Sequence, residues 1–150
     1  MTPPTHPNRQ ALTLKAWVIL SRAHSAVGAR AAADVAQHGL TLAEFGILEA
    51  LLHKGPLLLS ELKRKILVSA GGITYLVDRL ESRGLVERQP CEHDRRASYA
   101  ALTPAGQELI GGIFPGHAST LEQAFGALSD EELARLIEVG RKLGTSASGG

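Results

Sequence analysis

The chain has 150 residues, of which 44% are apolar and 21% charged, and its formal net charge is +1. These proportions fit one folded domain, residues 1–150, and exclude wholesale disorder. Cys91 is the one cysteine, which excludes an intramolecular disulfide framework and a zinc site built from several cysteines. The sequence opens without a secretory signal and contains no run of ~20 apolar residues. We therefore expect a cytoplasmic protein with no membrane partner.

Charge is unevenly spread along the chain. Half of the Lys and Arg residues fall within residues 61–100. Such a basic stripe suits a nucleic-acid partner, but composition alone favours an ordinary solvated surface.

Two helices are predicted in the first third of the chain. Residues 11–37 are rich in alanine and contain no proline, which favours one long helix. Thr41 and Glu44 have the spacing of a capping box, in which each side chain accepts a hydrogen bond from the other's backbone amide. The helix that they begin ends at Gly55 and Pro56.

Residues 60–84 predict a helix-turn-helix. Ser60 can cap a helix over Glu61–Ile66, and Ser69 can cap a second over Ala70–Arg83, which ends at Gly84. In the second helix the apolar residues share one face, so the polar residues between them point outwards. The apolar set is Ile73, Leu76, Val77 and Leu80, and the outward set is Thr74, Tyr75, Asp78 and Arg79.

The next segment predicts a β-hairpin with a basic tip. Its strands are expected at 85–88 and 98–102, joined by a charged loop over 89–97. Thr103 and Pro104 then start another helix, with threonine as the cap and proline at the first helical position. Pro115 is expected to kink or break that helix, and Ser129 with Glu132 predicts a capping box for a last one.

The common enzyme motifs are absent. The sequence contains no HExxH, GxGxxG, GxxxxGK[ST] or GxSxG pattern. The six histidines are scattered, and Cys91 with His93 supplies only two metal ligands where three or four are needed. We expect no enzyme, no metal site and no cofactor.

The helix-turn-helix and its hairpin have a direct use in binding DNA. A helix fits the major groove of double-stranded DNA, and a hairpin loop can reach the adjacent minor groove. A carboxylate contact from Asp94 can orient a neighbouring guanidinium for that groove. Two plainer readings stay open: the glycines merely loosen the helix entry, and the hairpin arginines are a solvated pair. The predicted DNA-contacting residues are Ser60, Ser69, Ala70, Gly71, Gly72, Thr74, Tyr75, Arg79, Asp94, Arg95 and Arg96.

Residues 41–106 resemble the winged-helix core of MarR-type transcriptional regulators. The likeness is clearest in ITYLVDRLESRGLV at 73–86 and in DRRA at 94–97, followed by LTPAG at 102–106. It implies a mainly α-helical fold with a small β-hairpin wing, in which residues 41–103 form the winged helix-turn-helix. Residues 11–38 and 104–144 would be dimerisation helices, so that a homodimer binds a palindromic operator. Carried over by position, 70–79 is the recognition helix, Arg96 enters the minor groove, Asp94 braces it, and Arg95 lies near phosphate.

The resemblance also implies regulation. Members of the family commonly repress genes for efflux or detoxification and release DNA when a phenolic or similar ligand binds. The runs at 42–51, 53–56 and 114–117 look most like the branch that responds to quinones and hydroquinones. Candidate ligand contacts are amphipathic residues near the first helix, although each can instead be a core or surface residue: Trp17, His24, His38 and Phe45.

Two alternatives are carried forward. Cys91 can serve as a redox switch, since arginine neighbours favour its thiolate, whereas Glu92 and Asp94 oppose it. A winged helix can also be used only for protein contact, without DNA binding. The cations at Arg79, Arg95 and Arg96 argue against that second use.

Overall fold

The computed structural model describes residues 8–66 and 70–149. Ser69, predicted both as a helix cap and as a DNA contact, lies outside these residues. The protein is mainly helical with one small antiparallel sheet, as predicted. In chain order its elements are α1 Arg9–Ala36, α2 Leu42–Lys54, β1 Leu57–Leu58, α3 Leu59–Ile66, α4 Ala70–Ser82, β2 Val86–Cys91, β3 Asp94–Leu102, α5 Pro104–Ala124 and α6 Asp130–Ser148.

Three predicted helix starts are confirmed by their caps. Thr41 and Glu44 form the capping box of α2, with both reciprocal hydrogen bonds at 3.1 Å. Ser129 and Glu132 form the same box at the start of α6. The hydroxyl of Thr103, the N-cap of α5, accepts a 3.0 Å hydrogen bond from the backbone amide of Gly106 in the first turn of that helix. Each cap satisfies amides that a helix start otherwise leaves free.

The predicted start of α3 is wrong. This helix begins at Leu59, so Ser60 lies inside its first turn instead of capping it. The reason is tertiary: Leu57 and Leu58 pair with Ala100 and Tyr99 of β3, and the helix follows that short strand without a loop. A two-residue strand leaves no periodic signal in the sequence.

The sheet is larger than the predicted hairpin. Its strand order is β1-β3-β2, and β2 pairs with β3 from Val86↔Leu102 to Cys91↔Asp94. The predicted loop over 89–97 is therefore mostly strand, with an irregularity between Pro90 and Cys91. Both faces of this ribbon near its tip are exposed, so its residues lack the apolar alternation by which strands are predicted.

The core lies where α2, α4 and α5 meet the base of the sheet. Val77 and Leu80 of α4 are fully buried, with Ile47 and Leu48 of α2 and Ile110 of α5. The predicted faces of α4 are thereby confirmed, since Thr74, Tyr75, Asp78 and Arg79 are all exposed. Gly84, at a φ of 74°, ends α4 in the left-handed conformation that glycine adopts most readily.

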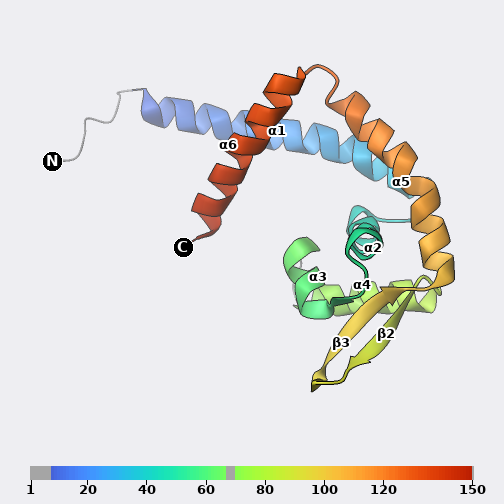
Figure 1. The fold of residues 1–150 in the computed structure, drawn as a ribbon. Coiled ribbons are helices and arrows are strands. Elements are labelled where there is room, and N and C mark those ends of the chain that lie inside the picture. Colours follow the sequence, from blue (N-terminus) through green and yellow to red (C-terminus); the bar gives the residue numbers. More distant parts are fainter. Residues whose placement is uncertain (1–7, 67–69, 150) are drawn as a thin grey trace.

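Helix α5 joins the two ends of the molecule. It continues through Pro115 without breaking and changes direction along its length, and it packs against both α1 and α2 (Figure 1). The imidazole Nδ1 of His117 lies 2.9 Å from the Asp34 carboxylate of α1, and its ring lies 4.3 Å from that of Phe45 in α2. Through these two contacts His117 of α5 connects α1 to α2.

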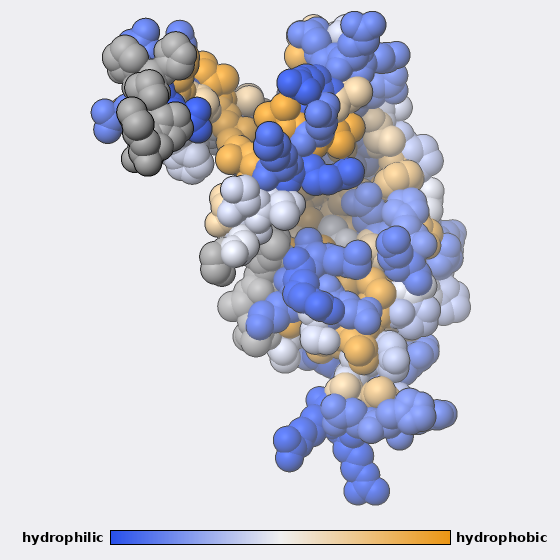
Figure 2. Space-filling model, turned by 60° about the vertical axis from the view of Figure 1, so that its left-hand side comes forward, coloured by the Kyte–Doolittle hydropathy of each residue, from blue (hydrophilic) through white to orange (hydrophobic). Residues whose placement is uncertain are grey.

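Apolar side chains outside the core gather at the end opposite the wing. Figure 2 shows them along the upper arms of the molecule, whereas the wing at the bottom is hydrophilic. The first three turns of α1 and nearly all of α6 are exposed, including large apolar residues such as Trp17 and Leu136. None of the described helices combines the length and hydropathy of a bilayer-crossing segment.

Candidate nucleic-acid interface

Helices α3 and α4 and the β2–β3 wing form the end of the molecule away from α1 and α6 (Figure 1). The inner side of α4 packs into the hydrophobic core through Ile73, Val77 and Leu80. The opposite side of α4 carries the exposed residues Thr74, Tyr75 and Arg79. Predicted residues Ala70 and Gly71 lie in the first turn of the same helix, and Gly72, half-buried, follows them.

Arg79 and Tyr75 form a unit on the exposed face of α4. The Arg79 guanidinium donates a 3.3 Å hydrogen bond to the Tyr75 hydroxyl and lies 5.9 Å from the centre of the Tyr75 ring. This hydrogen bond and the nearby Glu44 carboxylate raise the pKa of Arg79 further above its ordinary value. Arg79 is a cation, as every arginine in a protein is, and its guanidinium is hydrogen-bonded to Tyr75 one turn earlier in α4.

Glu44 brings a buried negative charge beneath this face. Its side chain is 1% exposed, and one carboxylate oxygen is used in the cap of α2. The other oxygen, Oε2, has no hydrogen-bond partner among the described residues and lies 3.8 Å from Arg79 and 3.9 Å from Arg83. Arg83 also donates a 2.9 Å hydrogen bond to the Gly39 carbonyl. Arg79 of α4 and Arg83, which directly follows this helix, thus compensate one buried carboxylate of α2.

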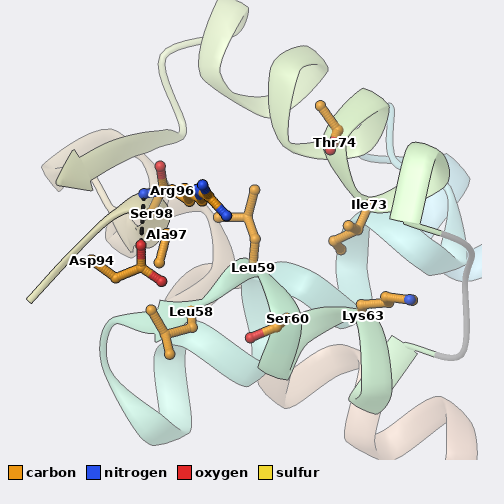
Figure 3. Close-up of a pocket in the computed structure, with 10 residues that line it drawn as sticks. All are labelled: Leu58, Leu59, Ser60, Lys63, Ile73, Thr74, Asp94, Arg96, Ala97 and Ser98. Carbon is orange, nitrogen blue, oxygen red and sulfur yellow. Dashed lines mark hydrogen bonds between the residues drawn. The ribbon is translucent and has the colours of Figure 1, made fainter. Parts of the chain in front are cut away.

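A groove separates α4 and α3 from the wing. It has a volume of about 480 Å³ and is lined by cationic and hydroxyl side chains over an apolar floor. Figure 3 shows Lys63 of α3 and Arg96 of β3 on opposite sides of this groove. Ser60 and Ser98 line it as well, whereas Asp94 adds one carboxylate. With Thr74, the lining includes two cations, three hydroxyls and one carboxylate, and cations with hydroxyls are the groups that contact a DNA backbone phosphate.

Lys63 was missed in the sequence-based prediction of DNA contacts. It lies in the Lys63-Arg64-Lys65 run of the last turn of α3. The run itself was visible in the sequence, but nothing in the sequence indicated that Lys63 borders the groove beside the wing. Arg64 and Lys65 instead line a separate, shallow surface depression with Glu61.

The wing holds Arg96 differently from the prediction. The Asp94 carboxylate accepts a 2.9 Å hydrogen bond from the backbone amide of Arg96, and the described residues show no ion pair between the two side chains (Figure 3). Asp94 therefore fixes the backbone at the tip instead of orienting the guanidinium. Because side chains alternate along a strand, Arg95 lies on the opposite face of β3 from Arg96.

The four predicted ligand contacts do not come together in one chain. Trp17 is 67% exposed, and His24 and His38 are also exposed, whereas Phe45 is a core residue against His117. His38 lies just after the end of α1, and helical rise places it about 30 Å from Trp17. One small molecule therefore cannot touch both residues of the same chain.

Cys91 lies at the outer end of β2 and is partly exposed, with a free thiol. His93 and Tyr99 border the same small depression in the wing surface. Across residues 8–66 and 70–149, no three His, Cys, Asp or Glu side chains are grouped as metal ligands would be.

Solved structures have the same architecture. AbsC, a MarR family transcriptional regulator from Streptomyces coelicolor, superposes with a TM-score of 0.85 at 24% identity, over 99% of this chain and 100% of that one. BpsR of Bordetella bronchiseptica, whose DNA binding is regulated by 6-hydroxynicotinic acid, superposes with a TM-score of 0.78 at 25% identity, over 87% and 98% of the two chains. The fold and its wing-flanked helix define the class: a winged helix-turn-helix protein.

Sequence relatives narrow the class to a family. Residues 38–97 match the model of the MarR family. The HTH-type transcriptional regulator MhqR of Bacillus subtilis is 37% identical over 135 residues, which cover 90% of this chain and 93% of that protein. The chain therefore belongs to the MarR family of DNA-binding transcriptional regulators, and the predicted resemblance is confirmed.

Proposed function

We propose that this protein is a homodimeric repressor that occupies a roughly palindromic operator and is released from it by a phenolic or quinone-like small molecule. It would act in the cytoplasm, where operator DNA is found. The observation that carries the proposal is the groove between the recognition helix and the wing, with Lys63 and Arg96 on its two sides.

On DNA, helix α4 would enter the major groove and present Thr74, Tyr75 and Arg79 to base edges and phosphates. The wing would lie beside it, so that Arg96 reaches the negative potential of the neighbouring minor groove. Lys63 would neutralise a phosphate between them. Phosphate contacts set the register of a protein on the duplex, and base contacts supply specificity.

The dimer is supported by the exposure of the terminal helices. Helix α6 has 19 residues and none of them is buried. In proteins, most of the stability of a helix comes from packing its apolar face against other elements. Its apolar stripe and the apolar turns of α1 therefore call for a partner, which the resemblance identifies as a second copy. The stripe includes Leu133, Leu136 and Leu143.

Ligand release is supported by relatedness and by the coupling geometry. BpsR, a structural neighbour, has its DNA binding regulated by an aromatic hydroxy acid. In this chain, α5 contacts both α1 and α2. A ligand that changes how α1 and α5 pack can therefore shift α2, and with it α4, which packs against α2. Trp17 and His24 could contribute to such a site only in company with residues of a second protomer.

The redox alternative rests on Cys91. Its partial exposure at the end of the wing makes the thiol accessible, and oxidation there would change the tip that carries Arg96. The alternative of a protein-contact module has no specific observation in its favour.

The test is DNA binding by the purified protein to its own upstream intergenic region at two salt concentrations, with and without a panel of phenols and quinones. We expect specific binding that weakens with salt, because phosphate contacts release counterions, and that one compound of the panel abolishes. Failure to bind at either salt concentration would refute the proposal and favour the protein-contact module.

Arg96→Ala is expected to weaken this binding by about 1 to 3 kcal/mol without changing thermal stability. Arg135→Ala is the matched control, since Arg135 is an exposed arginine of α6, remote from the wing, and is paired with Glu138. Equal effects of the two substitutions would remove Arg96 from the mechanism.

A further inference from the structure

The wing is tied to the recognition helix by one arginine. Arg88 lies in the middle of β2, and its guanidinium contacts two carboxylates of α4: Asp78 at 2.6 Å and Glu81 at 3.0 Å. The backbone amide of Arg88 donates a further 3.0 Å hydrogen bond to the second oxygen of Glu81. Strand and helix are therefore joined by three polar contacts, which we call the Arg88 clamp.

The position of these carboxylates is unusual for a DNA-binding surface. Asp78 is a neighbour of Arg79 and belongs to the exposed side of α4, and both Asp78 and Glu81 keep a substantial part of their surface in solvent. A negative charge near the phosphates of DNA opposes binding. Exposed ion pairs also contribute little to the stability of a fold. Neither electrostatic attraction to DNA nor stability alone accounts for two acidic residues at this place.

The geometry of the clamp does account for them. A planar guanidinium can hold two carboxylates in fixed directions, which a lysine ammonium cannot. Arg88 pairs with Ala100 in the register of β2 and β3, so a fixed Arg88 also fixes the strand that leads back to Arg96. The clamp thus sets the angle between the element expected in the major groove and the element expected in the minor groove.

We propose that Arg88 is a positioning residue for DNA recognition, which holds the wing against the recognition helix through Asp78 and Glu81. The proposal rests on the proposed function, because it concerns how the same interface meets the operator. Simple electrostatics and the clamp predict opposite results when the two carboxylates are neutralised. This difference in sign makes the proposal testable.

The variant is Asp78→Asn with Glu81→Gln, and the measurement is affinity for the operator by fluorescence anisotropy. The clamp predicts a loss of about three- to tenfold in affinity although two negative charges are gone. Glu87→Gln is the matched control, because Glu87 is an exposed carboxylate on the same strand that pairs with neither α4 nor Arg88. It is expected to leave affinity unchanged or slightly raised.

Arg88→Gln separates positioning from direct contact with phosphate. If Arg88 acts through the carboxylates, adding the Asp78 and Glu81 substitutions to Arg88→Gln produces no further loss. In the Arg88→Gln protein, Arg96→Ala is also expected to cause a smaller loss of operator affinity, because Arg96 contributes less to binding when the wing is not held in place. A merely structural role would instead lower the unfolding temperature of every variant and leave the Arg96→Ala penalty unchanged.

Affinity equal to or above that of the unaltered protein in the Asp78→Asn, Glu81→Gln variant would overturn the clamp. Full additivity with Arg88→Gln would overturn it as well. Absence of operator binding by the unaltered protein is a different result, since it overturns the proposed function itself and the clamp with it.

Discussion

Gly106 is the position at which one added methyl group should do most damage to this fold. It lies buried in the first turn of α5, where its amide donates to the Thr103 hydroxyl. A Cβ at this position would overlap the carbonyl oxygen of Leu85, lie 2.9 Å from the Leu85 carbonyl carbon and lie 3.2 Å from a methyl of Leu102. The first two of these atoms are backbone, which cannot swing away as a side chain end can.

The cost can be worked from these contacts. Overpacking a well-filled site costs about 1 to 3 kcal/mol. Separating α5 from Leu85 also breaks the 3.1 Å hydrogen bond from the Thr103 amide to that same carbonyl, which is worth about 1 kcal/mol. Gly106→Ala should therefore lower the free energy of unfolding by about 2 to 4 kcal/mol, or the melting temperature by about 5 to 15 °C.

Thermal unfolding followed by circular dichroism measures this effect. Gly111→Ala is the control within the same helix, since Gly111 is exposed and a Cβ there meets nothing within 4 Å. Alanine is the better helix former by up to about 1 kcal/mol, so the control should be neutral or stabilising. A melting temperature for Gly106→Ala that equals that of Gly111→Ala would refute the close approach of α5 to Leu85.

Three further substitutions test other parts of the structure. His117→Ala should destabilise the protein by about 2 to 4 kcal/mol in chemical denaturation, because it removes the Asp34 contact and leaves a cavity beside Phe45; a change below about 0.5 kcal/mol would contradict the buried contact. Leu136→Glu should shift the proposed dimer towards monomer in sedimentation velocity, whereas Ala134→Glu, on the polar side of α6, should not; equal behaviour of the two would argue against the apolar stripe as the interface. Cys91→Ser should leave operator binding and ligand release unchanged, and loss of release would favour the redox alternative.

Local signals in the sequence determined the helices that begin at caps. The pairs at Thr41 and Glu44, and at Ser129 and Glu132, specify helix starts because their hydrogen bonds involve only residues three apart. The apolar periodicity of 73–80 likewise determined which side of α4 is buried and which is exposed. The family motifs determined the winged helix, since they span the recognition helix and the wing in order.

Other features depend on contacts between residues distant in sequence. The strand β1, and with it the start of α3 at Leu59, exists because Leu57 and Leu58 pair with β3 about forty residues later. The strands of the wing extend to its tip because their backbones pair, although their exposed side chains show no alternation.

The candidate site divides in the same way. The sequence by itself determined that Arg79 and Arg96 are exposed cations on the helix and the wing. Only the tertiary structure places Lys63 opposite Arg96 across one groove and aims Arg88 at Asp78 and Glu81. The physical reason is that a side chain's direction in space depends on how its element packs, and packing is decided by the whole core.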